Sequence, residues 1–232
     1  MYALVKDVPK ALLPIRERPL IHYIIDKIKP LDGLSEIIVV TNDKFYKTFT
    51  DWAAAKKNFP FPLRIVNDGT KTPETRLGSI GDMNFVLKQG VVKSDLLIVG
   101  GDNLFDYNLD AYLKFARSKS PAASIGLYDI KNIEEATKFG VVELNKDSRI
   151  VSFEEKPQKP KSSLVAMCFY YLPKASLGLV AEYLSASAKS DTAGDYIRWL
   201  SEKKDVYGFK FTGKWYDIGS IESYQEAQEK FR

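Results

Sequence analysis

An aspartate that follows a short apolar run is the first candidate for chemistry in this chain. Asp102 comes after the uninterrupted run 96–99 and two glycines. Such a run is typical of a strand buried on both faces, and ligands of open α/β sheets bind beyond the carboxyl ends of such strands. A carboxylate there suits Mg²⁺, which one or two carboxylates usually hold together with substrate phosphates. The competing interpretation, an aspartate that caps the next helix, has equal weight on this stretch alone.

A second aspartate lies in a similar neighbourhood near the end of the chain. Asp217 is the third residue of Trp215-Tyr216-Asp217-Ile218-Gly219, and like Asp102 it follows a β-like segment. The two carboxylates are therefore expected to meet at one sheet edge. Two carboxylates alone would repel each other, and a divalent cation bridging them to a phosphate would remove that repulsion. A turn-forming role for each aspartate is an equally good interpretation.

Two lysines lie next to prolines, which restrict the backbone. Lys10 follows Pro9, and Lys156 precedes Pro157. Because proline fixes its own φ and restrains the preceding residue, we expect these ammonium groups to be aimed more sharply than surface lysines on helices. Lysine is a common partner of phosphate, and the neighbouring carboxylate of Glu155 could accept hydrogen bonds from sugar hydroxyls. The alternative is a surface ion pair that contributes about 0–1 kcal/mol.

Composition excludes several classes of protein. The 232 residues fit one large domain over 1–232, with 45% apolar and 28% charged residues and a net charge of +4. Charges of both signs are interspersed, so nucleic acid is not an expected partner. No apolar segment approaches membrane-spanning length, so a membrane is not expected either. A lone cysteine, Cys168, lies in an apolar run and fits a reducing, cytoplasmic setting. The single histidine, His22, is expected to be structural.

Apolar periodicity predicts an α/β fold with a doubly wound, mostly parallel but mixed sheet. Strands alternate with helices in the first half, which is typical of βαβ units. The second half adds a hairpin over 140–153, interpreted as a substrate lobe built onto the same domain. The segment 9–14 is expected to be extended and 215–219 to be a turn. The predicted helices are 19–29, 44–57, 77–89, 109–119, 174–188, 195–203 and 221–230, and the predicted strands are 37–40, 63–66, 96–99, 123–128, 140–144, 149–153, 164–172 and 206–211.

Phosphate-binding signatures of the common kinds are absent. The sequence has no Walker loop and no G-x-G-x-x-G. The helix entry Leu77-Gly78-Ser79 has small residues that would admit a flat base or a ribose, which is a weak signal on its own.

Taken in order, these motifs resemble the sugar-phosphate nucleotidylyltransferases of the glucose-1-phosphate thymidylyltransferase type. The resemblance extends from near residue 2 to the C-terminus, and the order and spacing of its motifs make it specific. The matching motifs are Pro9-Lys10-Ala11-Leu12-Leu13-Pro14 with Pro19-Leu20-Ile21, Leu77-Gly78-Ser79, Gly101-Asp102-Asn103, Phe139-Gly140-Val141-Val142, Phe153-Glu154-Glu155-Lys156-Pro157 and Trp215-Tyr216-Asp217-Ile218-Gly219.

The resemblance implies a Rossmann-like nucleotide-diphospho-sugar transferase fold and a reaction. In the family, a sugar-1-phosphate oxygen attacks the α-phosphorus of a nucleoside triphosphate, of the dTTP or UTP class here, and pyrophosphate leaves. The partners would be the nucleoside triphosphate and the sugar-1-phosphate, with Mg²⁺ as cofactor. The implied roles are Mg²⁺ binding for Asp102 and Asp217, contact with nucleotide phosphates for Lys10, contact with the base for Gly78, and sugar-phosphate binding for Gly140, Glu155 and Lys156.

One departure from the family pattern stands at the start of the chain. The family begins with a buried central strand and a glycine-rich loop of the type G-x-G-x-R-[LM], whereas residues 2–8 resemble the segment that follows that loop. There are three competing explanations: the start is wrongly placed, the chain has been trimmed, or the chain functions without this strand and loop. We expect little or no transferase activity from the chain as given. A sheet without its central strand would also favour a partner, such as a second copy in a homo-oligomer.

Two other functions remain open at this point. A non-catalytic sugar-nucleotide-binding or regulatory subunit fits the missing loop, whereas the retained metal carboxylates favour the enzyme. A metal-dependent glycosyltransferase is the weaker alternative, because no Asp-x-Asp stands at 100–103. The base and the sugar cannot be identified from these residues.

Overall fold

The computed structural model describes residues 6–55, 59, 61–186 and 192–231. The chain divides into two compact units, each built from discontinuous segments. Unit 1 comprises Met1–Leu77, Gly100–Leu109 and Gly213–Arg232, and unit 2 comprises Gly78–Val99 and Asp110–Thr212. The two units are described separately below, and a single domain over 1–232 stays a prediction.

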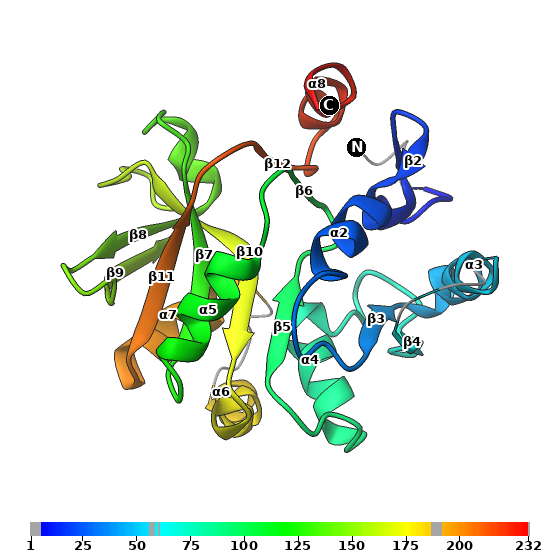
Figure 1. Ribbon diagram of the computed structural model, residues 1–232, viewed down its shortest axis with the longest axis horizontal. Helices are drawn as coiled ribbons and strands as arrows, with labels where there is room; N and C mark the ends of the chain where they lie inside the picture. Colours follow the sequence, from blue (N-terminus) through cyan, green and yellow to red (C-terminus); the bar gives the residue numbers. More distant parts are fainter. Residues whose placement is uncertain (1–5, 56–58, 60, 187–191, 232) are drawn as a thin grey trace. The chain divides into compact units, whose positions relative to one another are not determined.

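Unit 2 contains a six-stranded mixed sheet (Figure 1). Its central strand is β10, which pairs with β5, β7 and β8, all antiparallel; β8 continues to β9, and β7 pairs in parallel with β11. The nine apolar and aromatic residues of β10 suit this place, because a central strand is covered on both faces. The strands are β5 (Leu96–Val99), β7 (Ala123–Asp129), β8 (Gly140–Leu144), β9 (Ile150–Glu155), β10 (Leu164–Leu172) and β11 (Val206–Phe211).

The predicted hairpin is β8–β9, and its turn chemistry is visible. The Asn145 side chain accepts hydrogen bonds from the N–H groups of Asp147 and Arg149, at 3.0 and 2.9 Å. Ser148 has φ of 65°, a left-handed conformation that tight turns require and that side chains disfavour. Register within the hairpin places Gly140 opposite Glu155.

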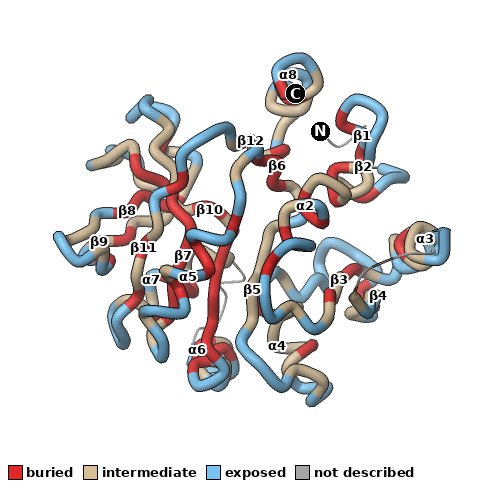
Figure 2. Tube along the Cα trace, in the orientation of Figure 1, coloured by how far each residue is buried: buried red, intermediate tan, exposed pale blue. Residues whose placement is uncertain are grey.

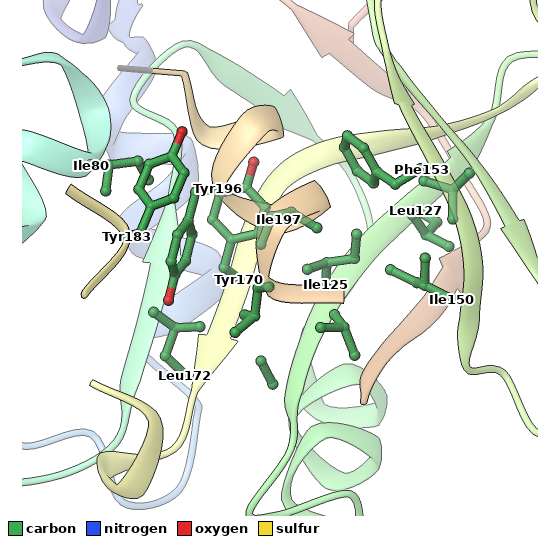
Figure 3. Packing of buried hydrophobic residues seen from close by; sticks show 14 of the residues in the cluster. Ile80, Ile125, Leu127, Ile150, Phe153, Tyr170, Leu172, Tyr183, Tyr196 and Ile197 are labelled. Atoms are coloured by element: carbon green, nitrogen blue, oxygen red, sulfur yellow. The ribbon is translucent and has the colours of Figure 1, made fainter. Parts of the chain in front are cut away.

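Helices α4 (Gly78–Lys88), α6 (Gly178–Ala186) and α7 (Ala193–Lys203) contribute apolar side chains to the core of unit 2. Figure 3 shows Tyr183 beside Ile80, and Tyr196 between Tyr183 and Leu172. The rings of Tyr183 and Tyr196 meet edge to face, with centroids 5.2 Å apart. A fourth helix, α5 (Asp110–Ser118), packs on β7 and β11. No helix in the described segments is long and apolar enough to cross a membrane.

Unit 1 contains the βαβ arrangement that the alternating pattern predicts. Strands β3 (Ile37–Thr41) and β4 (Leu63–Asn67) pair in parallel on either side of α3 (Asp43–Ala54) in the sequence. The predicted helix at 19–29 is α2 (Leu20–Ile28), whose isoleucines and Leu20 are buried (Figure 2). His22 on α2 accepts a hydrogen bond from Trp52 Nε1 at 2.9 Å, which supports a structural role.

Smaller elements complete unit 1. The short strands β1 (Pro14–Ile15) and β2 (Arg18–Pro19) form one antiparallel pair, and β6 (Asn103–Phe105) and β12 (Trp215–Asp217) form another. The chain then enters α8 (Ile221–Lys230), where Ser220 and Ser223 form a capping box. The α/β class and the mixed sheet are thus confirmed.

Two local predictions were wrong, and one short strand was not predicted. The stretch between Pro9 and Pro14 is not extended throughout, because it forms the short 3₁₀ helix η1 (Lys10–Leu12), in which Leu13 N donates to Lys10 O at 3.0 Å. The predicted turn at 215–219 begins as β12, and its partner β6 was not expected at all. Strands of three residues carry too little periodicity to be recognised.

Most helix boundaries differ from the prediction by a few residues. The helix predicted at 174–188 is a 3₁₀ turn, η3 (Lys174–Ser176), followed by α6 from Gly178, and residues 187 and 188 lie outside the described residues. Helix α7 starts at Ala193, two residues before the predicted start at 195, because Thr192 caps it through a hydrogen bond from Asp195 N.

Candidate active site

The pairing of β6 with β12 brings the backbones of the two candidate metal-binding aspartates together. Asp217 lies opposite Asn103 in the register, and Ile218 N donates to the carbonyl oxygen of Asp102 at 2.9 Å. Sequence reasoning placed both aspartates at the edge of the main sheet. The structure instead brings them together through a separate two-stranded pair within unit 1.

Lys10 joins the same group. Its ammonium Nζ lies 3.2 Å from Asp102 Oδ2, with the side chains 37% and 32% exposed. Lys10 is the first residue of the 3₁₀ turn η1. Its neighbour Ala11 lies against Gly101, because a Cβ added to Gly101 would come within 3.3 Å of the alanine Cβ. The glycine before Asp102 thus permits the close approach of η1 that brings Lys10 to the carboxylate.

Two further residues orient Asp102, and sequence reasoning gave them no role. Asn103 is almost fully buried, and its Nδ2 donates to Asp102 Oδ1 at 3.2 Å. The indole Nε1 of Trp215 donates to Asn103 Oδ1 at 2.7 Å. Both residues stand inside motifs that were recognised, but a hydrogen bond between residues as distant in sequence as Trp215 and Asn103 leaves no local pattern.

The donor set of this group fits a hard divalent cation. Asp102 and Asp217 stand on adjacent backbone segments, and carboxylate oxygens are ligands that Mg²⁺ prefers. The Asp102 oxygens already accept from Lys10 and Asn103, and each carboxylate oxygen has a second lone pair. Among the described residues, no three His, Cys, Asp or Glu side chains gather as a metal cluster, so phosphate oxygens would have to complete the coordination.

A second group of candidate residues lies in unit 2, around the end of β9. Gly140 of β8 stands opposite Glu155, and Lys156 N donates to Phe139 O at 3.0 Å. The ammonium of Lys156 is 3.9 Å from Glu155 Oε1, and its side chain is 62% exposed. A loose ion pair of this kind leaves the ammonium accessible to a phosphate.

The backbone of Lys156 departs from the expectation for a residue before proline. Its φ is 45°, in the left-handed region, whereas the pre-proline rule predicts an extended conformation. Such a conformation costs a non-glycine residue about 1–3 kcal/mol and persists where the surroundings impose it. The hydrogen bond to Phe139 and the last β9 pair impose it here.

Gly140 has a packing reason as well as a candidate role. A Cβ at this position would meet Phe153 Cζ at 2.5 Å and Glu155 Oε2 at 3.1 Å. The glycine therefore makes room for the buried Phe153 ring and for the Glu155 carboxylate.

Burial raises the pKa of Glu155. The nearby Asp195 raises this pKa further, whereas Lys156 and Arg198 act against the rise. The side chain is 18% exposed, and yet the structure keeps a carboxylate there. A partly buried carboxylate that costs stability is typical of a functional position.

Glu155→Gln is expected to stabilise the fold at pH 7. A raised pKa in the folded state means that stability is fully present at low pH and falls as the pH rises through the raised pKa. The neutral amide does not lose stability in this way, so the gain in unfolding free energy should vanish below about pH 4, where the glutamate is protonated in both states.

Urea unfolding at pH 4 and pH 7 measures this difference in unfolding free energy. Glu154→Gln, which removes the exposed partner of Lys161, is the matched control and should show no gain; a Glu155→Gln gain that persists at pH 4 would contradict the explanation.

Gly78 is explained by its backbone. It opens α4 with φ of 74°, a conformation that suits glycine, and nothing in its geometry distinguishes a base-binding role from this one. The structure thus brings Lys10, Asp102 and the Asp217 backbone together in unit 1, and Gly140, Glu155 and Lys156 together in unit 2; Gly78 belongs to unit 2. Their roles stay predictions.

The fold and these residue groups define an α/β protein with basic groups suited to phosphates and carboxylates suited to a divalent cation or to hydroxyls. Comparison with known proteins makes this specific, because a family described as nucleotidyl transferase matches residues 1–232. The chain belongs to this nucleotidyl transferase family.

Relatives within the family agree on the class. The chain is 29% identical over 238 aligned residues to a glucose-1-phosphate thymidylyltransferase of Neisseria meningitidis serogroup A, an alignment that covers 98% of this chain and 76% of that protein. It is 30% identical over 138 residues to a glucose-1-phosphate adenylyltransferase of Clostridium acetobutylicum, covering 57% and 35% of the two chains. A bifunctional protein GlmU of Methanocaldococcus jannaschii is 26% identical, with coverage of 93% and 47%. The chain therefore spans less than half of the length of the last two relatives.

Solved structures share the fold. A putative glucose-1-phosphate thymidylyltransferase from Bacillus anthracis, crystallised with sucrose, superposes with a TM-score of 0.81 at 21% identity, covering 99% of this chain and 89% of that one. A UDP-glucose pyrophosphorylase in complex with UDP-glucose gives 0.80 at 19% identity, with coverage of 97% and 91%. At these identities the likeness establishes the fold alone.

Proposed function

We propose that the site is built for Mg²⁺-dependent transfer of a nucleotidyl group from dTTP or UTP to a sugar-1-phosphate, with release of pyrophosphate; the turnover expected of the chain as given is low. The observation that carries the proposal is the Lys10–Asp102 pair beside the Asp217 backbone, within a chain of the nucleotidyl transferase family. The names of the relatives favour glucose 1-phosphate as the acceptor.

Charge complementarity supports a division of roles. Lys10 would bind nucleotide phosphates, and Lys156, whose ammonium is exposed, would bind the phosphate of the sugar. Glu155 has only carboxylate oxygens to offer, so it would accept hydrogen bonds from sugar hydroxyls. Gly78 would lie against the base and Gly140 against the sugar.

The chemistry needs positioning and charge neutralisation rather than a covalent intermediate. Mg²⁺, held by Asp102 and Asp217, would neutralise negative charge on the phosphates. Lys10 would bind the triphosphate, and Lys156 would bind the phosphate of the sugar-1-phosphate, whose oxygen attacks the α-phosphorus. The bond from that phosphorus to the leaving pyrophosphate breaks as the new phosphoanhydride bond between the sugar phosphate and the nucleotidyl group forms.

Release of pyrophosphate tests the proposal. The chain is incubated with MgCl₂, glucose 1-phosphate and either dTTP or UTP, and both pyrophosphate and the nucleotide sugar are quantified. Formation of the two products in equal amounts, dependent on both substrates and abolished by EDTA, is the supporting result. Absence of both turnover and binding of either substrate would refute the proposal.

The regulatory alternative gives a different outcome in the same experiment. Binding of the nucleotide sugar without any release of pyrophosphate would favour a sugar-nucleotide-binding subunit. We further propose that the chain acts in the cytoplasm, where nucleoside triphosphates are available and the lone Cys168 stays reduced. Size measurement in solution would test the proposed homo-oligomer.

A further inference from the structure

One side of the Glu155 carboxylate is covered by the backbone of helix α7. Helix α7 packs against β9, and the Glu155 carboxylate lies directly against Gly194 in the first turn of that helix. A Cβ added to Gly194 would lie 2.6 Å from Glu155 Cδ and closer still to Oε2. Real Cβ atoms essentially never approach that closely, so the carboxylate can occupy its present place only because residue 194 has no side chain.

The first turn of α7 cannot retreat from the carboxylate. Tyr196, Ile197 and Leu200 are buried in the core of unit 2, and Thr192 caps the helix through Asp195 N. The end of a glutamate side chain, in contrast, is free to rotate. A side chain at 194 is therefore accommodated by displacing the Glu155 carboxylate, with little cost to the fold.

Charged groups and a helix end lie close to the Glu155 carboxylate. The N-terminal end of a helix carries a partial positive charge that favours a carboxylate. Around it, Arg198 and Lys156 supply positive charge and Asp195 negative charge, and Arg198 Nη2 is held by Asp195 Oδ1 at 3.0 Å. Lys156 is only loosely paired with the carboxylate, at 3.9 Å, whereas Gly194 of α7 lies directly against it.

We propose that Gly194 determines sugar recognition: the space it leaves at the start of α7 holds the Glu155 carboxylate where it accepts hydroxyls of the sugar phosphate and stays apart from Lys156. The inference rests on the proposed function, in which Glu155 contacts the sugar. Gly194 is a positioning residue, because it acts only through Glu155. The ligand class is a sugar-1-phosphate, recognised separately through its hydroxyls and through its phosphate.

Gly194→Ala and Gly178→Ala form a matched pair of variants. Both replace a glycine at the start of a helix of unit 2, but a Cβ at Gly178 meets nothing within 4 Å. Glucose 1-phosphate and inorganic phosphate are titrated into each variant by calorimetry. We expect Gly194→Ala to bind glucose 1-phosphate about tenfold more weakly, with unchanged affinity for phosphate. Gly178→Ala should match the unchanged chain with both ligands.

A double-variant cycle separates positioning from a general structural effect. If Gly194 acts through Glu155, Gly194→Ala should lower glucose 1-phosphate affinity no further once Glu155→Ala is present. Equal binding by Gly194→Ala and Gly178→Ala, or additive losses in the cycle, would overturn this inference alone. If the unchanged chain binds glucose 1-phosphate no better than phosphate, the proposed sugar site fails, and this inference fails with it. Thermal unfolding confirms that each variant is folded.

Discussion

Asp102→Asn is expected to lower the rate of pyrophosphate release by at least about 100-fold while leaving the fold nearly unchanged. The Asp102 carboxylate pairs with the Lys10 ammonium, and the backbone carbonyl of Asp102 accepts a hydrogen bond from the N–H of Ile218, next to the second aspartate. An amide has the same shape but no charge, so it binds Mg²⁺ poorly, and loss of groups around catalytic metals costs about 10- to 100-fold even when they are not direct ligands.

The small effect on stability follows from exposure. Lys10 and Asp102 each have about a third of their side chain exposed, and such a pair contributes about 0–1 kcal/mol. In the Asp102→Asn variant, the amide oxygen could still accept a hydrogen bond from Lys10. A large loss of turnover beside a small change in unfolding free energy therefore separates a functional carboxylate from a structural one.

Asp26→Asn is the matched control for this experiment. Asp26 also belongs to unit 1 and also faces a lysine, Lys29, at 3.2 Å, but it lies on α2 and takes no part in the β6–β12 pair. Pyrophosphate release and direct titration with Mn²⁺, which needs no turnover, should distinguish the two variants. If Asp102→Asn binds Mn²⁺ and turns over as Asp26→Asn does, Asp102 is not a metal ligand.

The sequence predicts the larger strands well because their signal is local. Runs such as 96–99 and 164–172 are apolar without a break, and both are strands in the structure, β5 and β10. The structure adds the order and pairing of the strands, which the local sequence does not contain. Strand β10 is central and pairs antiparallel with three neighbours, and β6 and β12 are too short to be recognised before their pairing is seen.

In the candidate site, too, some residues could be recognised from the sequence, whereas the contacts that hold them in place could not. Asp102 and Glu155 are visible in the sequence because they stand in compact motifs. The hydrogen bonds from Trp215 to Asn103, and the approach of Gly194 to Glu155, join segments that are far apart in the chain. Such contacts depend on tertiary packing, so a motif can identify the acting group but not what holds it in place.

The strained backbone of Lys156 gives the last prediction, because it separates stability from function at one residue. Lys156→Gly is expected to weaken glucose 1-phosphate binding by about 10- to 100-fold, since a charged hydrogen bond to the phosphate is worth about 1.5–3 kcal/mol. The same change should raise the free energy of unfolding by about 1 kcal/mol, because glycine adopts a φ of 45° without strain and keeps its N–H bond to Phe139.

Ser148→Gly supplies the control that makes this argument decisive. Ser148 also has a left-handed backbone, with φ of 65°, and it lies in the turn of the same β8–β9 hairpin. It should show a similar gain in urea unfolding with unchanged binding of glucose 1-phosphate. Loss of stability in Lys156→Gly would show that the lysine conformation is not strained, and unchanged binding would remove the lysine from the sugar-phosphate site. Both expected results together would mean that the fold holds an unfavourable backbone at Lys156 for the sake of its ammonium.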